Sequence, residues 1–137
     1  MMLEKPADTQ FPVHDLIRRR WSPRAFADTP LQAAQLGSLL EAARWAASSN
    51  NEQPWRFLVA TKEQPQEFAA LLDCLNPSNQ TWVKHAPVLM LSVARVAFED
   101  GTVNRHAWHD VGQAAASLAI QATALGLVVH QHEGDGG

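Results

Sequence analysis

The chain has 137 residues, of which 46% are hydrophobic and 18% are charged, a composition typical of one globular domain and unlike that of a disordered segment. Its formal net charge of −3 provides no overall positive field, which argues against nucleic acid or an anionic membrane surface as a partner. Cys74 is the only cysteine, which excludes an internal disulfide and favours a reducing, cytoplasmic location.

The N-terminus does not resemble a signal peptide, because its first ten residues include charged residues and a proline rather than an apolar core behind a basic head. The longest strongly apolar run, residues 86–94, is far too short to span a bilayer. We therefore expect a soluble protein in which residues 1–12 form an N-terminal extension and residues 13–137 form one domain.

The first half of the domain is predicted to contain two helices and a strand. Residues 13–20 carry apolar side chains on one face and end in three arginines, which favours a short helix. Thr29, followed by a proline and then a glutamine three residues on, is typical of a helix start, and apolar spacing carries this helix to about Ala47. Residues 55–61 follow a proline and are rich in aromatic and branched residues, which favours a strand.

The second half is predicted to alternate helices and strands. A helix is expected over residues 67–75, and the apolar run 87–94 is expected to be a strand at the centre of the sheet, covered on both faces. Residues 108–125 predict a long buried helix that Gly126 ends, with alanines keeping its sides slim, and residues 127–131 predict a last strand. The face expected to be buried consists of Trp108, Val111, Ala115, Leu118, Ala122 and Leu125.

A first polar motif spans residues 18–26. Four of the eleven basic residues lie here within seven positions, on both sides of Ser22. Arginine binds phosphate oxygens in two-point geometry and a hydroxyl adds one more donor, so the motif suits a phosphate. The alternative, a solvated basic end on a helix, stays open at this point.

A second polar motif lies between the predicted helix and the first strand. Residues 48–53 are six consecutive polar residues whose amides and hydroxyls could bind the edge of a planar heterocycle. The same composition also fits a plain polar connection.

The two motifs together resemble those of the nitroreductase family. Residues 20–26 are similar to the family's N-terminal phosphate motif, and residues 48–55 to a serine-containing loop that runs into Asn-x-Gln-Pro-Trp. Residues 79–88 are similar to the family's segment entering the next strand, and residues 110–127 to its long central helix. The resemblance covers roughly residues 13–134.

The resemblance implies an α+β fold, a nitroreductase-like α/β/α sandwich whose central sheet is mainly antiparallel and flanked by helices. Family members usually continue past the position of Gln131 through further helices and a strand, and a basic residue there completes the phosphate site. We therefore expect the C-terminal part of the fold to be missing from this chain.

The resemblance also implies an FMN site shared by the two subunits of a homodimer. Arg20, Ser22 and Arg24 would hold the phosphate and ribityl chain, and the serine loop would approach the flavin from the partner subunit. The backbone of Glu133 and Gly134 would face the reactive flavin nitrogen. The implied cofactor-binding residues are Arg20, Trp21, Ser22, Arg24, Ser48, Ser49, Asn51, Gln53, Asn79, Glu133 and Gly134.

The function implied is an FMN-dependent NAD(P)H oxidoreductase that reduces nitroaromatic, quinone or enone-like acceptors by hydride transfer through the flavin. No side chain need be a nucleophile, because the cofactor carries the redox chemistry. Two alternatives remain, a non-catalytic flavin-binding remnant of the same family and a small helical interaction domain without a cofactor.

The histidines and the cysteine are not expected to form a site of their own. His106 and His109 could share a helix face and His130 and His132 one side of a strand, but no third or fourth ligand has a convincing place, so no metal is expected. Cys74 lies among leucines and is expected in the core rather than as a nucleophile.

Overall fold

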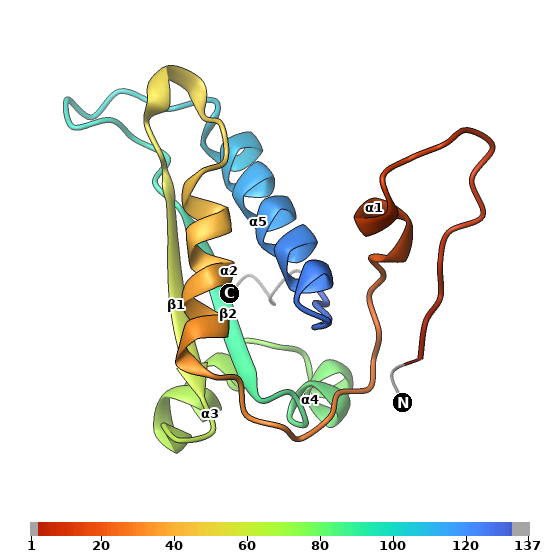
Figure 1. Cartoon of the computed structure of the whole chain (residues 1–137). Coiled ribbons are helices and arrows are strands. Elements are labelled where there is room, and N and C mark those ends of the chain that lie inside the picture. The colour runs from red at the N-terminus through yellow and green to blue at the C-terminus, as the bar shows by residue number, and fades with distance from the viewer. Residues whose placement is uncertain (1–2, 133–137) are drawn as a thin grey trace.

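The computed structural model describes residues 3–132, which form an α+β fold of helices around a small antiparallel sheet (Figure 1). In chain order the elements are α1 (Asp15–Arg19), α2 (Ala33–Arg44), a single 3-10 turn (Ser49–Asn51), β1 (Trp55–Thr61), α3 (Pro65–Asp73), α4 (Pro77–Val83), β2 (Val88–Ala94) and α5 (Ala107–Ala124). The expected fold class is therefore confirmed.

The sheet of the described residues consists of β1 and β2, paired from Trp55 opposite Ala94 to Thr61 opposite Val88. Both strands were predicted within one residue of their observed bounds. The prediction that β2 is covered on both faces was wrong, because Leu91 and Val93 are 37% and 40% exposed. An apolar run indicates a strand but does not show whether a second layer covers it.

The core lies where α2 and α5 pack against each other and against the sheet. Ala114 and Ala122 are fully buried there, so the small side chains of α5 let the two helices approach closely, as predicted. The amide of Gln121 on α5 donates to the hydroxyl of Ser38 on α2 at 2.9 Å. The buried cluster consists of Leu39, Ala43, Trp55, Val111, Ala114, Leu118 and Ala122.

The predicted buried face of α5 was wrong at both of its ends, because Trp108 is 71% exposed and Leu125 is 36% exposed. Asn104, Ala107 and Asp110 are the buried residues around the start of α5. Periodicity favoured the large tryptophan for the core, but in the folded chain smaller side chains take the positions that face inward.

Helix α2 differs from its prediction at both ends. Helix α2 begins at Ala33 rather than just after Thr29, because Gln32 is its N-cap. The backbone N–H of Gln32 donates to Gln35 Oε1 at 2.9 Å, which is one half of a capping box. The helix ends at Arg44, three residues before the expected Ala47.

Helix α4 was not predicted. The Asn76 side chain accepts the N–H of Asn79 at 2.9 Å and Pro77 occupies the first turn, which is an ordinary helix start. The preceding helix, expected over residues 67–75, runs in the structure over Pro65–Asp73.

After α5 the chain turns at Gly126, whose φ of +72° confirms it as the helix stop. The strand predicted over residues 127–131 is absent, and the segment runs there without a strand partner among the described residues. Leu127 and Val129 nevertheless pack against the core cluster. The apolar residues of segment 127–131 therefore contact the core, but the segment does not pair as a strand.

Cys74 is exposed rather than buried, so its predicted place in the core was wrong. It lies just after the last residue of α3, and its thiol donates to the carbonyl of Ala70 at 3.4 Å. The leucines beside it face inward only in part.

At the N-terminus, the Ala7 N–H donates to the carbonyl of Arg18 at 2.8 Å, which ties the start of the chain to α1. Among the described helices, none is long and apolar enough to cross a membrane.

Candidate functional site

The four arginines of the first motif divide into two pairs. Arg18 and Arg19 both bind the carboxylate of Asp15, with N to O distances of 3.0 and 2.6 Å. These hydrogen bonds hold the pKa of Asp15 below its ordinary value. Arg20 and Arg24 form no ion pair with any residue in the range 3–132, so their charges are available to an anion.

The hydroxyl of Ser22 lies beside one of these available cations. Arg20 Nη1 donates to Ser22 Oγ at 3.4 Å, and both side chains are exposed. The motif therefore presents a guanidinium and a hydroxyl at one turn, directly after α1.

Trp82 of α4 ties the first motif to the end of the chain. The guanidinium of Arg24 lies 5.9 Å from the centre of the Trp82 ring, and Phe26 stacks on the same ring at 6.0 Å. His130 packs on Trp82 at 4.7 Å, and its Nδ1 lies 2.9 Å from the carbonyl oxygen of Pro23. Since a carbonyl only accepts, His130 Nδ1 carries the proton and donates to it.

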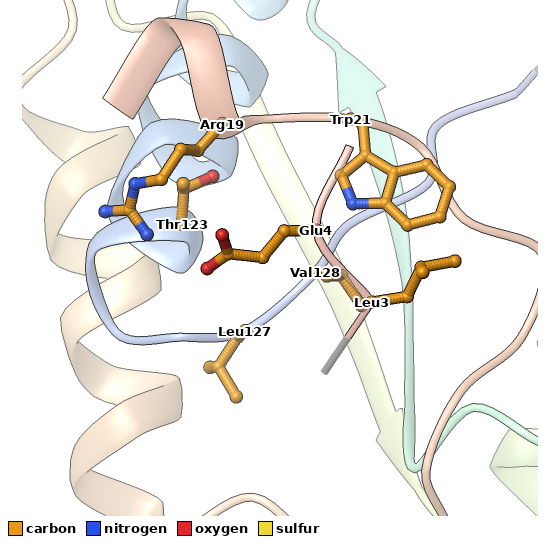
Figure 2. A pocket seen from close by; sticks show the side chains of 7 residues that line it. All are labelled: Leu3, Glu4, Arg19, Trp21, Thr123, Leu127 and Val128. Atoms are coloured by element: carbon orange, nitrogen blue, oxygen red, sulfur yellow. The ribbon is translucent and has the colours of Figure 1, made fainter. Parts of the chain in front are cut away.

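Trp21 is half buried and lines a small pocket at the C-terminal end of α5 (Figure 2). Leu3 and Glu4 of the N-terminal segment lie in the same pocket, with Thr123 of α5 behind them. Trp21 therefore shares this pocket with residues from the start of the chain.

The second motif is a tight loop that contains left-handed backbone. Asn50, Asn51 and Gln53 have φ values of +52°, +55° and +51°. Residues other than glycine pay roughly 1 kcal/mol or more for this region, asparagine less than most. The loop needs other contacts to hold it in this shape.

Some of those contacts lie within the loop. The Gln53 N–H donates to Ser48 Oγ at 3.0 Å, and the Gln53 carboxamide donates to Asn51 Oδ1 at 3.0 Å. One predicted site residue, Gln53, thus helps to fix the positions of two others, Ser48 and Asn51.

Further contacts come from outside the loop. The Ser49 N–H donates to Asp110 Oδ2 at 3.0 Å, and Glu52 forms an ion pair with Arg95, whose backbone N–H donates to the Pro54 carbonyl at 2.8 Å. Asp110 is only 2% exposed. The sequence analysis assigned no role to Asp110 or Arg95, although a carboxylate in the first turn of a helix rich in apolar residues is a signal that could have identified Asp110.

The two motifs lie at opposite ends of α5 (Figure 1). Asp110, in the first turn of the helix, binds the loop of the second motif, whereas Thr123, in the last turn, lies in the pocket with Trp21. At about 1.5 Å of rise per residue, these positions are about 20 Å apart. One chain therefore does not gather the two motifs at one point.

Asn79 lies on the same short helix as Trp82, and so on the side of the first motif. Its backbone N–H binds the helix cap, and its side-chain amide makes no hydrogen bond to any other described residue. Glu133 and Gly134 lie outside the described residues, but His132, just before them, packs on Trp82 at 5.8 Å. Of the predicted site residues, the structure thus groups Arg20, Trp21, Ser22, Arg24 and Asn79, and separately Ser48, Ser49, Asn51 and Gln53.

Known proteins share both the sequence and the fold. Residues 17–81, which contain both motifs and Asn79, match the model of the nitroreductase family. The solved structure of an oxidoreductase containing FMN is 37% identical, superposes with a TM-score of 0.84, and covers 90% of this chain. The chain is a nitroreductase-like family member. Similarity over the fold and over the two motifs explains why the sequence resemblance was informative.

The chain spans only part of the length of the nitroreductases that it matches. A nitroreductase from Desulfovibrio desulfuricans, solved in complex with FMN, is 30% identical with a TM-score of 0.69, and the match covers 85% of this chain and 65% of that one. Nitrobenzene nitroreductase of Ectopseudomonas oleovorans is 45% identical over 51 residues, which are 37% of this chain and 22% of the relative. The chain spans 64% of the FMN-containing oxidoreductase.

Proposed function

We propose that this nitroreductase-like chain binds FMN and serves an NAD(P)H oxidoreductase that reduces nitroaromatic, quinone or enone-like acceptors. The observation that carries the proposal is the state of Arg20 and Arg24. Both lie within the family match, both are exposed, and neither is neutralised by a carboxylate of the described chain. The FMN held by two similar solved structures supports the choice of cofactor.

The residues present fit the phosphate end of FMN. A phosphate needs cations and hydroxyl donors without competing acids, and Arg20 with Ser22 offers both at one turn. Arg24, held against Trp82, adds a second guanidinium on the same segment. Asp15 does not compete, because Arg18 and Arg19 already bind it.

The ring end of FMN is assigned to the second motif. The backbone and side chains of Ser48, Ser49, Asn51 and Gln53 supply amide and hydroxyl groups suited to the polar edge of an isoalloxazine. Because this loop lies about 20 Å along α5 from the first motif, we infer that it meets FMN held by another copy of the chain. The proposed assembly is therefore a homodimer with shared sites.

When bound, FMN supplies the redox chemistry, taking a hydride from NAD(P)H and passing electrons to the acceptor. The protein residues hold and orient the cofactor and donate hydrogen bonds to it; no side chain of the chain is assigned as a nucleophile. Asn79, whose amide has no partner among the described residues, lies on the side of the first motif and is assigned to the cofactor from there.

The test begins with the purified protein and FMN. Binding is measured by the quenching of flavin fluorescence, and turnover by NADH or NADPH oxidation with a nitroaromatic or a quinone. Tight binding with acceptor-dependent oxidation supports the proposal. FMN binding without any oxidation would favour the non-catalytic flavin-binding alternative, and a protein that FMN neither binds nor stabilises would refute both.

A further inference from the structure

The loop of the second motif is strained and tightly held at the same time. Three residues that are not glycine, Asn50, Asn51 and Gln53, have left-handed backbone within four positions. Such a conformation persists only where surrounding structure fixes it, and it is found most often at functional sites.

Asp110 is the best placed of the residues that fix it. Its side chain is buried on α5, the helix that packs against α2 in the core, and it accepts the Ser49 N–H at 3.0 Å. The bond joins a helix of the buried core to Ser49, the first residue of the 3-10 turn. The Glu52 and Arg95 ion pair anchors the other end of the loop to the segment after β2.

Packing alone does not explain a carboxylate at this position. The neighbouring inward positions of α5, Ala107, Val111 and Ala114, are apolar, and a buried charge is unfavourable unless hydrogen bonds compensate it. The Asp110 side chain accepts its hydrogen bond from the loop and not from its own helix. The carboxylate therefore acts on the conformation of the loop.

We infer that Asp110 is a positioning residue, which presets the Ser48 to Gln53 loop in the shape that contacts the flavin ring. The inference rests on the proposed function for its consequence, but its structural part stands on the contacts above. The Glu52 and Arg95 pair is the second anchor. Neither anchor needs to touch the cofactor.

The experiment compares Asp110→Ala, Asp110→Asn and the control Val111→Ala, which removes buried apolar atoms from the adjacent position without touching the loop. Hydrogen exchange of amides 49–53 is measured without flavin, and the dissociation constants of FMN and riboflavin are measured by fluorescence. Asp110→Ala should speed exchange of these amides and raise both dissociation constants by the same factor, about tenfold for one lost anchoring hydrogen bond.

Asp110→Asn should remain close to the unchanged protein, because its carboxamide oxygen can accept the same N–H. Val111→Ala should lower the melting temperature without changing loop exchange or flavin affinity. Adding Glu52→Gln to Asp110→Ala should loosen the loop further, since it removes the second anchor.

The inference is overturned if Asp110→Ala leaves exchange of amides 49–53 unchanged, or if it alters flavin affinity no more than Val111→Ala does. If the unchanged protein binds no flavin, the proposed function fails while the exchange measurement still decides the role of Asp110. Faster exchange confined to the loop in Asp110→Ala would then support the positioning role by itself.

Discussion

Removing the two available arginines is the most direct test of the phosphate assignment. Arg20 and Arg24 lack carboxylate partners in the described structure, so changing both to alanine breaks no internal ion pair. The change also removes the hydrogen bond from Arg20 to Ser22 and the contact of Arg24 with Trp82, so a second ligand is needed to separate lost phosphate contacts from a rearranged site. Riboflavin, which lacks the phosphate, should be largely unaffected.

The size of the effect follows from the exposure of the site. Hydrogen bonds to charged groups contribute about 1.5–3 kcal/mol each, and the lower end applies because both side chains are exposed to solvent. Two such contacts amount to about 3 kcal/mol, which raises the dissociation constant of FMN by about 100-fold.

The chain offers a matched control in Arg18→Ala with Arg19→Ala. This double variant removes the same two positive charges a few residues away, but from arginines that Asp15 already holds. Titration of each variant with FMN and with riboflavin, followed by flavin fluorescence, separates the cases. Equal losses for FMN and riboflavin in Arg20→Ala with Arg24→Ala, or an FMN loss just as large in the control, would refute the assignment.

Three further outcomes are expected. Leu118→Ala, in the core between α2 and α5 at 6% exposure, should lower the free energy of unfolding by about 3 kcal/mol in urea titrations, whereas Val103→Ala at 69% exposure should change it little. The pKa of Asp15 is lowered by Arg18 and Arg19, so its stabilising contribution is present above its ordinary pKa and is lost as pH falls through the lowered value; an NMR titration should show that pKa rising when both arginines become alanine. FMN should promote a dimer in sedimentation at several protein concentrations, and tight FMN binding by a persistent monomer would contradict the shared site.

The sequence predicted the bounds of the strands better than the burial of their faces. Apolar runs identified β1 and β2 closely, because strand composition is local information. The burial of β2 depended on layers elsewhere in the fold, and Leu91 shows that one face stayed exposed. The start of α2 differed for another reason, because the folded chain uses Gln32 as the N-cap although Thr29 carries the side chain that more often caps a helix.

For the site, the sequence likewise identified the residue types but not the contacts that they make. The sequence marked the arginines and the polar loop through their residue types, but all four arginines looked alike until Asp15 was seen to hold two of them. Asp110 was noticed only as part of a motif, because its hydrogen bond to Ser49 joins residues 61 positions apart. Pairing over such distances leaves no trace in local composition.

Because the two motifs lie apart, binding of the FMN phosphate and binding of the flavin ring should depend on different parts of the assembly. The arginine motif is a property of one chain, since Arg20, Ser22 and Arg24 lie within five positions and need no second copy to approach a phosphate. The loop lies at the far end of α5, so its contribution to the same FMN requires another chain. Phosphate affinity should therefore persist at protein concentrations where the dimer dissociates, whereas contacts with the ring should be lost. Loosening the loop through Asp110 should weaken dimerisation most in the presence of flavin, because the proposal places the ligand between this loop and the other chain.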